Sequence, residues 1–267
     1  MLPLMEIYLS KVLVKIVSCP IEDREFSIYS KKKLEKDGTL TIPDFLHKEV
    51  VSDLVKEAKS CQHLAFYTKS THNVYLTPKS EEYDEDHIFN KQIISSKGCI
   101  TTDQIPENSY LKTIYRSEIF KNFIANLVDE KALYEYEDPL SSINVHYASE
   151  GQELGWHFDN SSFAVTLLLQ KPKNGGVFEY VKNVRDSDKG DFAFEKVERI
   201  VEGTLKPSIL EIEPGTLVLF KGKNSIHRVT PTIGDLTRYL VVFAYNSKPG
   251  VSLSKSAQKT FYGRTVE

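Results

Sequence analysis

The sequence predicts an α+β fold with a jelly-roll (double-stranded β-helix) core and flanking N-terminal helices. Apolar residues recur at helical spacing in the first half of the chain, whereas short β-branched or aromatic runs follow from residue 141. Gly, Pro, Asn and Asp separate these runs, which is typical of an antiparallel sandwich or barrel. We therefore expect one domain over 1–267, with mostly helical N-terminal support (1–135), a jelly-roll core (136–250) and a C-terminal tail closing on it (251–267).

Two helices and one loop are expected before the core. Asp44 is expected to cap a helix through FLHKEVVSDLVKEAKS, and a second helix is expected from Ser109, with its apolar stripe continuing to Leu127. The stretch TPKSEEYDEDHIFNK (77–91) is charged and poorly periodic, which predicts a loop.

The core is expected to contain strands joined by turns. The runs interpreted as strands are SINVHYA, FAVTLLLQ, GVFEYV, LEIEP, GTLVLFKG and RYLVVFAYN. KNGG (173–176) and EPGT (213–216) are expected to be turns, since glycine permits positive φ. A helix is expected in FAFEKVERIVEG, after the charged loop 182–191, which is either a lid or simply an exposed run of charges.

Composition narrows the class of protein. The net charge of -3 gives no general field that would attract nucleic acid. The three cysteines are far apart and form no C-x-x-C pair, which favours a reducing cytoplasm over a disulfide framework or a cysteine zinc site. Charged residues interrupt the apolar opening MLPLMEIYLSKVLVKIVSCP, so we interpret it as a strand or helix packed on the domain and expect no membrane association.

The stretch GWHFDN places a histidine and a carboxylate two residues apart. In a strand, His157 and Asp159 project to one face, and Trp156 and Phe158 to the other. Taken alone, the first pair is either a structural ion pair or two ligands of one metal.

A later histidine favours the metal. His227, in GTLVLFKGKNSIHRVTP, lies 70 residues beyond His157, which leaves room for strands to run out and back across a sandwich. Two histidines and one carboxylate on facing strands form the facial triad of non-haem Fe(II) oxygenases, which leaves one face of the metal open.

Arg238 lies in the next apolar strand, where a buried guanidinium requires an anionic partner. Its planar fork suits a carboxylate. That partner is either a buried Asp or Glu of the protein or the carboxylate of a ligand.

Together, His157, Asp159, His227 and Arg238 resemble the Fe(II)/2-oxoglutarate-dependent oxygenases. Over residues 108–264 the chain resembles the bacterial group of radical halogenases of free amino acids and their hydroxylase relatives. The stretches that carry this resemblance are INVHYASEGQELGWHFDNSSFAVTLLLQ, GGVFEY, GTLVLFKGKNSIHRVTP and FYGR.

The resemblance implies a cofactor, two cosubstrates and their ligands. His157, Asp159 and His227 match the Fe(II) ligands, with 2-oxoglutarate and O2 as cosubstrates, and Arg238 matches the clamp on the distal carboxylate of 2-oxoglutarate. Asn144 and Tyr147 match the region that supplies polar contacts to 2-oxoglutarate. They fall on opposite faces of an ideal strand, so a core role for Tyr147 stays open.

The carboxylate decides the expected reaction. In the halogenases a small residue replaces it and chloride takes the vacated position, whereas this chain has Asp159. The resemblance therefore implies a dioxygenase that hydroxylates a small molecule, a free amino acid, and converts 2-oxoglutarate to succinate.

Substrate residues are less well defined. Asp138 is a candidate partner for a substrate ammonium, Asn160 for a bound ligand, and Tyr262 for closing the pocket. Each also has a structural interpretation, as a turn residue in the first two cases and as a docked aromatic tail in the third.

Two other function classes stay open. One is an oxygenase acting on protein or nucleic acid, although no stripe of Lys and Arg with interleaved aromatics favours the latter. The other is a non-enzymatic metal-binding β-sandwich, which would not need an open metal face or a carboxylate clamp.

Overall fold

The computed structural model describes residues 16–266 of the chain. Most of the opening stretch that we interpreted as a packed strand or helix (1–15) lies outside the described residues. Within the described part, no helix is both long enough and apolar enough to cross a bilayer.

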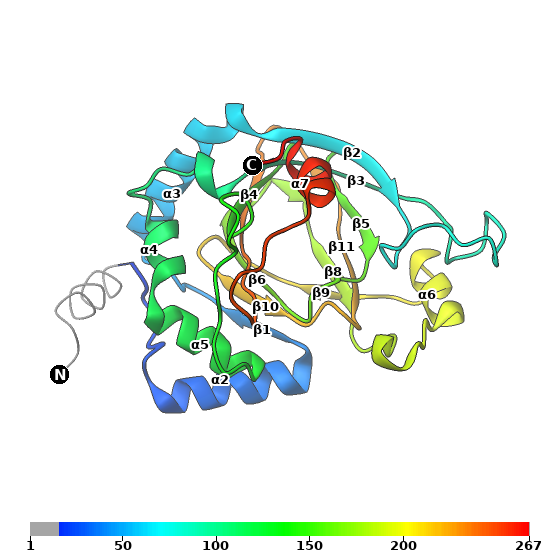
Figure 1. Cartoon of the computed structure of the whole chain (residues 1–267), viewed down its shortest axis with the longest axis horizontal. Coiled ribbons are helices and arrows are strands. Elements are labelled where there is room, and N and C mark those ends of the chain that lie inside the picture. Colours follow the sequence, from blue (N-terminus) through cyan, green and yellow to red (C-terminus); the bar gives the residue numbers. More distant parts are fainter. Residues whose placement is uncertain (1–15, 267) are drawn as a thin grey trace.

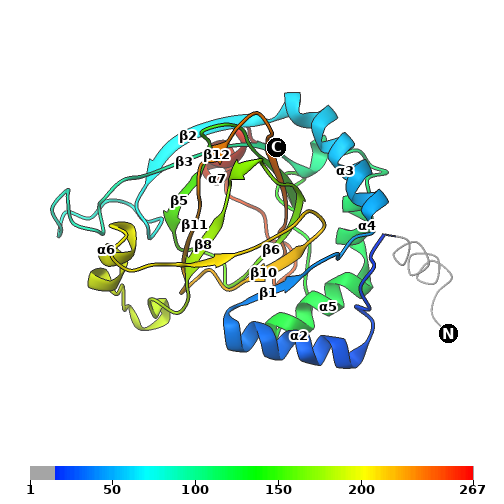
Figure 2. The ribbon, with the colours of Figure 1, turned by 180° about the vertical axis from the view of Figure 1, so that it is seen from behind.

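Four helices lie on one side of a curled β-sheet. Figure 1, and Figure 2 from behind, show α2, α3, α4 and α5 along this side, with α6 at the far end of the molecule. The helices are α2 (Arg24–Asp37), α3 (Lys48–Cys61), α4 (Tyr110–Arg116), α5 (Glu118–Val128), α6 (Phe194–Val201) and α7 (Lys255–Tyr262).

The strands form one large antiparallel sheet and a small two-stranded one. The large sheet has the order β1-β10-β6-β13-β4-β3-β5-β11-β8-β9, with β2 also paired to β3, and the small sheet pairs β12 with β7. The strands are β1 (Thr39–Ile42), β2 (Phe66–His72), β3 (Ile93–Ile100), β4 (Ile143–Ala148), β5 (Leu154–His157), β6 (Ala164–Gln170), β7 (Asn174–Gly175), β8 (Phe178–Val181), β9 (Ser208–Leu210), β10 (Leu217–Phe220), β11 (Ile226–Val229), β12 (Thr232–Ile233) and β13 (Arg238–Phe243).

The large sheet curls so that its two halves face each other across an internal cavity. Thr166 of β6, Val218 of β10 and Leu240 of β13 line this cavity from one half, and His157 of β5 and His227 of β11 line it from the other. This arrangement confirms the predicted α+β jelly-roll class.

Alternation along the strands divides the sheet into an outer face and a cavity face. On β4, the buried Ile143, Val145 and Tyr147 belong to the core shared with the N-terminal helices, whereas His146 lines the cavity. The outer face of the other half packs a second core, which includes Trp156, Phe158 and aromatic residues of the 77–91 loop and of α6.

The N-terminal segment contributes strands as well as helices. The sequence did not indicate β1, β2 and β3, yet β1 pairs with β10, and β3 pairs with β2, β4 and β5. These strands belong to the core sheet, because their pairing partners lie far along the chain.

Two details of the predicted N-terminal helices were wrong. The first helix begins at Lys48 with His47 at its N-cap, while Asp44 has a φ of 49° and lies outside the helix. The helix predicted from Ser109 is two helices, because Ser117 ends α4 and its hydroxyl accepts the Phe120 N–H at the start of α5.

The core elements largely follow the prediction. Five of the six predicted runs contain strands, and 77–91 contains no helix or strand, as expected. LEIEP was wrong, since β9 ends at its first residue. The turn predicted at EPGT is present, with Gly215 at positive φ, whereas the turn predicted at KNGG was wrong, because Asn174–Gly175 forms β7 and pairs with β12.

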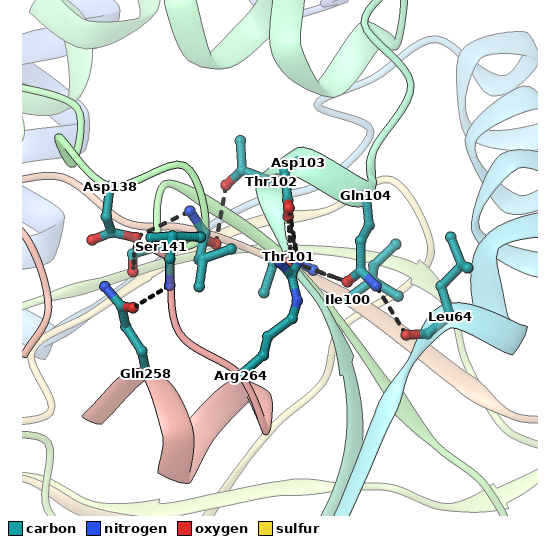
Figure 3. Close-up of polar contacts among 12 residues, drawn as sticks. Leu64, Ile100, Thr101, Thr102, Asp103, Gln104, Asp138, Ser141, Gln258 and Arg264 are labelled. Carbon is teal, nitrogen blue, oxygen red and sulfur yellow. Dashed lines mark hydrogen bonds and ion pairs between the residues drawn. The ribbon is translucent and has the colours of Figure 1, made fainter. Parts of the chain in front are cut away.

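The C-terminal tail docks beside the end of β3. Figure 3 shows Arg264 reaching from beyond α7 to Thr101 and Asp103, at Nη2–Oγ1 2.6 Å and Nη2–Oδ1 2.7 Å. This ion pair and the burial of Tyr262 against Cys99 and Leu140 hold the tail on the core.

Candidate metal centre

Two histidines and an aspartate converge on the internal cavity. His157 ends β5, Asp159 follows two residues later, and His227 on β11 is the direct pairing partner of His157. Asp159 Oδ1 lies 3.8 Å from His157 Nε2 and 3.5 Å from His227 Nε2. One potential ligand atom of each residue lies within 4.8 Å of the others, so the three can share one ion.

Local packing forces these side chains inward. Trp156 and Phe158 are buried in the second core on the opposite face, and the guanidinium of Arg185 lies 4.1 Å from the Phe158 ring centroid. Rotating the strand would expose both aromatic residues, so their burial keeps His157 and Asp159 on the cavity side.

Backbone carbonyls orient both imidazoles for metal binding. His157 Nδ1 lies 2.7 Å from the Gly155 carbonyl, and His227 Nδ1 lies 3.1 Å from the Ser225 carbonyl. A proton on each Nδ1 makes these hydrogen bonds and leaves each Nε2 lone pair free to coordinate a metal.

The Asp159 carboxylate has an unsatisfied oxygen. Its Oδ2 is buried without a hydrogen-bond partner, and such an atom is costly unless a ligand completes it. Gly222 packs closely against it, since a Cβ at that position would lie 1.8 Å from Oδ2. The Asp159 N–H also donates to the Gly222 carbonyl at 3.1 Å, which fixes the carboxylate beside the histidines.

Electrostatics favour the protonation states that ligands need. Burial, reinforced by the neighbouring His227, lowers the pKa of His157. Burial opposes ionisation of Asp159, but His227, His157 and Lys97 lower its pKa overall. A neutral His157 imidazole and an ionised Asp159 carboxylate, together with His227, form a nitrogen and oxygen donor set that fits Fe(II).

The cavity beside the triad has a volume of about 260 Å³ and is walled mainly by apolar side chains. Phe178 and Phe220 pack around His227, with ring centroids 5.4 Å and 4.8 Å from its own. A small, mostly apolar chamber with a few convergent polar groups is typical of a ligand site.

Arg238 begins β13 and lines the same cavity. Its side chain is buried, and among residues 16–266 no hydrogen bond or ion pair engages its guanidinium. Burial lowers the pKa of Arg238 to about 10. The sequence left two possible partners for Arg238, a protein carboxylate or a ligand carboxylate. The described residues do not supply the first. A second hollow of about 390 Å³ also reaches Arg238 from the side of Gly175 and Gly176.

The two residues expected near 2-oxoglutarate do not line the cavity. Tyr147 points to the helices, where its hydroxyl donates to the Ala58 carbonyl at 2.8 Å, so it takes the core role. The Asn144 amide donates to the carbonyls of Leu140 and Ile143, and its oxygen accepts from the Tyr262 hydroxyl at 3.1 Å.

The three candidate substrate residues also lie outside the cavity lining. Asp138 accepts hydrogen bonds from the backbone of Leu140 and Leu253 and from the Ser141 hydroxyl, which is a turn and tail-docking role (Figure 3). Asn160 directly follows Asp159 and is exposed. Tyr262 anchors the tail through its hydrogen bond to Asn144.

Sequence reasoning missed four polar residues of the cavity lining, which are Ser161, Thr166, Lys97 and His146. The two ionisable ones each had a usable signal. Lys97 is the only charged residue in the apolar run IISSKGCI, and His146 alternates with apolar residues in INVHYA, which places it on the face opposite the core.

Comparison with known proteins identifies the family. The family model described as Halogenase D matches residues 21–262, which is most of the chain. No curated protein matches the chain in sequence.

Solved structures share the fold at low identity. The epimerase SnoN from nogalamycin biosynthesis has a TM-score of 0.57 at 12% identity, over 84% of each chain. HygX from Streptomyces hygroscopicus, solved with nickel, 2-oxoglutarate and hygromycin B, has a TM-score of 0.55 at 13% identity, over 87% of this chain and 90% of HygX. A Trichoplax adhaerens prolyl hydroxylase with a peptide fragment has a TM-score of 0.54 at 14% identity, over 86% of this chain and 96% of its own.

With the family model spanning the jelly roll and both halves of the candidate metal centre, the chain belongs to the Halogenase D family and has the fold of the 2-oxoglutarate- and Fe(II)-dependent oxygenases.

Proposed function

We propose that this protein is an Fe(II)/2-oxoglutarate-dependent hydroxylase of a small molecule, a free amino acid. One observation carries the proposal. Three potential metal ligands and a buried Arg238, which has no partner in the described part of the chain, line one small cavity. A plain metal site would not need the arginine, and a plain anion site would not need the triad.

His157, Asp159 and His227 would hold the iron. Their Nε2 and carboxylate atoms supply three ligands, and the Gly155 and Ser225 carbonyls keep the two imidazoles oriented. When bound, Fe(II) with 2-oxoglutarate supplies oxygen activation, coupled to decarboxylation of 2-oxoglutarate to succinate. With only three protein ligands, these residues would leave the metal accessible from the cavity.

Arg238 would bind the distal carboxylate of 2-oxoglutarate. Its guanidinium offers a planar pair of donors in a setting where water does not compete. The apolar walls around it, including Val218 and Leu240, exclude solvent and strengthen that ion pair.

Asp159 favours hydroxylation over chlorination. Its carboxylate would take the position that a halide would need, and Gly222 packs close to Oδ2, which restricts movement of the carboxylate. We therefore expect the enzyme to replace a substrate hydrogen with a hydroxyl group and not with chlorine.

The small cavity supports a small substrate, since about 260 Å³ lies below the usual range of pockets for drug-sized ligands. The resemblance to oxygenases of free amino acids supports that class of substrate. We also propose that 1–267 acts as one domain, because strands of the N-terminal segment complete the sheet. The three free cysteines favour a cytoplasmic location.

The test is anaerobic loading with Fe(II) and 2-oxoglutarate, followed by oxygen exposure with a panel of free amino acids. We expect succinate and one product heavier by one oxygen. Turnover of a peptide or nucleic acid, with no amino acid oxidised, would transfer the activity to a macromolecular substrate. Stoichiometric iron without any succinate would contradict an oxygenase.

Replacement of the carboxylate tests the reaction outcome. Asp159→Gly should weaken iron binding and let chloride coordinate, whereas the unmodified protein should hydroxylate even in abundant chloride. Chlorination by the variant also depends on where the substrate lies, which the pocket sets. Mass spectrometry of turnovers in chloride gives the readout, and a chlorinated product from the unmodified protein would refute Asp159 as an iron ligand.

A further inference from the structure

Lys97 and His146 form a polar pair on the cavity wall beside the triad. Lys97 lies on β3 and His146 on β4. Cys99 is the direct pairing partner of His146, and Lys97 lies two residues before Cys99, so Lys97 and His146 lie on the same face of the sheet. The Lys97 Nζ is 3.1 Å from His146 Nε2 and 3.3 Å from His146 Nδ1.

The imidazole occupies only part of the ammonium's hydrogen-bonding capacity. An ammonium has three donors, whereas a neutral imidazole has one acceptor nitrogen. Burial, together with Lys97 and Arg238, lowers the pKa of His146 well below its usual value, which keeps the ring neutral. Two Lys97 donors therefore remain available to the cavity.

The charges around Lys97 leave it without an anion of its own. No carboxylate of the described residues forms an ion pair with Lys97. Asp159 attracts it electrostatically but would be a metal ligand. Asp159 and one carboxylate of 2-oxoglutarate would balance the charge of Fe(II), and the other carboxylate would balance Arg238. Lys97 would then be the remaining cation of the cavity lining.

Lys97 is half-buried, and its partial loss of hydration is unfavourable until an anion pairs with it. Burial lowers the pKa of Lys97, although Cys99 and Asp159 act in the opposite direction. A carboxylate next to the Nζ would stabilise the ammonium and satisfy its free donors. A lysine that only packed its methylene groups on an apolar surface would instead extend its ammonium into solvent.

We propose that Lys97, supported by His146, is a carboxylate-binding site on the wall of the metal cavity. The inference rests on the proposed function, because it assumes that iron and 2-oxoglutarate occupy the cavity. Two ligands could bring the carboxylate. The charge balance favours the substrate, which would then be an acid such as an amino acid, over the metal-proximal end of 2-oxoglutarate.

The test uses Lys97→Met, which keeps the length of the side chain and removes its charge. Lys69→Met is the matched control, since Lys69 is an exposed lysine on the adjacent strand β2. Both variants and the wild type are loaded anaerobically with Fe(II). They are then titrated with 2-oxoglutarate by visible absorbance, and with amino acids and their decarboxylated amines by thermal shift.

If the site binds the substrate, Lys97→Met should keep its 2-oxoglutarate affinity within about twofold. In the same variant, the ratio of the affinity for an amino acid to the affinity for the matching amine should fall by tenfold or more. If the site binds the cosubstrate, the 2-oxoglutarate affinity itself should fall by tenfold or more. Lys69→Met should match the wild type in both titrations.

A variant that keeps both the 2-oxoglutarate affinity and the ranking of amino acids and amines would overturn the proposal. If Lys97→Met does not fold, Lys97→Arg keeps a cation and should retain carboxylate binding, whereas His146→Phe should weaken it. Absence of the Fe(II)–2-oxoglutarate absorbance in the wild type would instead refute the proposed function, so the two failures are distinguishable.

Discussion

The two faces of β4 and β13 differ in how their polar groups are satisfied. On the outer face, Tyr147 and Tyr239 are direct pairing partners with ring centroids 5.2 Å apart. Their hydroxyls donate to the Ala58 carbonyl and to Gln62 Oε1, at 2.8 Å and 2.9 Å. On the cavity face of the same strands, Arg238 is buried with no partner among residues 16–266, and the neutral His146 contacts the ammonium of Lys97.

The difference separates residues that stabilise the fold from residues that await a ligand. The helices complete the outer face, so its polar atoms cost little on burial. The protein alone does not complete the cavity face, where unpaired polar groups lower stability. Natural strands keep such groups mainly where a ligand supplies the missing partner.

The largest expected effect is loss of the metal. His157→Ala or His227→Ala removes one of three ligands and should abolish Fe(II) binding at micromolar metal, while the metal-free protein keeps its melting temperature. Iron content after gel filtration and thermal melts provide the readouts. His63→Ala, at an exposed histidine, is the control. Stoichiometric iron and turnover in either triad variant would sink the ligand assignment.

The next effect concerns the arginine of the cavity face. Arg238→Met should weaken 2-oxoglutarate binding by roughly 2–5 kcal/mol, which is about 30- to 4,000-fold in affinity. The ligand-free variant should be as stable as the wild type or more stable, because a buried unpaired cation is removed. Calorimetric titration and thermal melts measure the two quantities. Marked destabilisation with unchanged 2-oxoglutarate affinity would show that Arg238 has a structural partner.

The smallest effect concerns the outer face. Tyr147→Phe removes the hydrogen bond to Ala58 and should lower the free energy of unfolding by about 1 kcal/mol. The affinity for 2-oxoglutarate should not change, because the hydroxyl points away from the cavity. Chemical denaturation and the same calorimetric titration test this. A large loss of affinity would mean that the two faces are not independent.

Local patterns predicted the parts of the molecule that depend on neighbouring residues. The spacing of His157 and Asp159 placed both on one face, and the apolar context of Arg238 marked it as buried, because strand geometry links positions two apart. The turn at Gly215 was predictable from the Pro-Gly pair itself, whereas the turn predicted at Gly175 failed because that residue pairs with the distant Thr232.

The parts that failed depend on distant partners. β1 is a strand because it pairs with β10, and Lys97 meets His146 only through the register of β3 and β4. Tyr147 and Asn144 were both candidates until pairing and packing set which face each occupies. The break at Ser117 was missed because its hydroxyl caps α5 inside a continuous apolar stripe.

Anaerobic titration of the wild type with Fe(II) and then with 2-oxoglutarate tests most directly whether ligands complete the cavity face. We expect a weak visible charge-transfer band that needs both components and saturates at one 2-oxoglutarate per chain. The band should be absent in His227→Ala, and in Arg238→Met at concentrations that saturate the wild type. Iron bound by the wild type without any such band, or a band of unchanged affinity in Arg238→Met, would show that these ligands do not complete the cavity face.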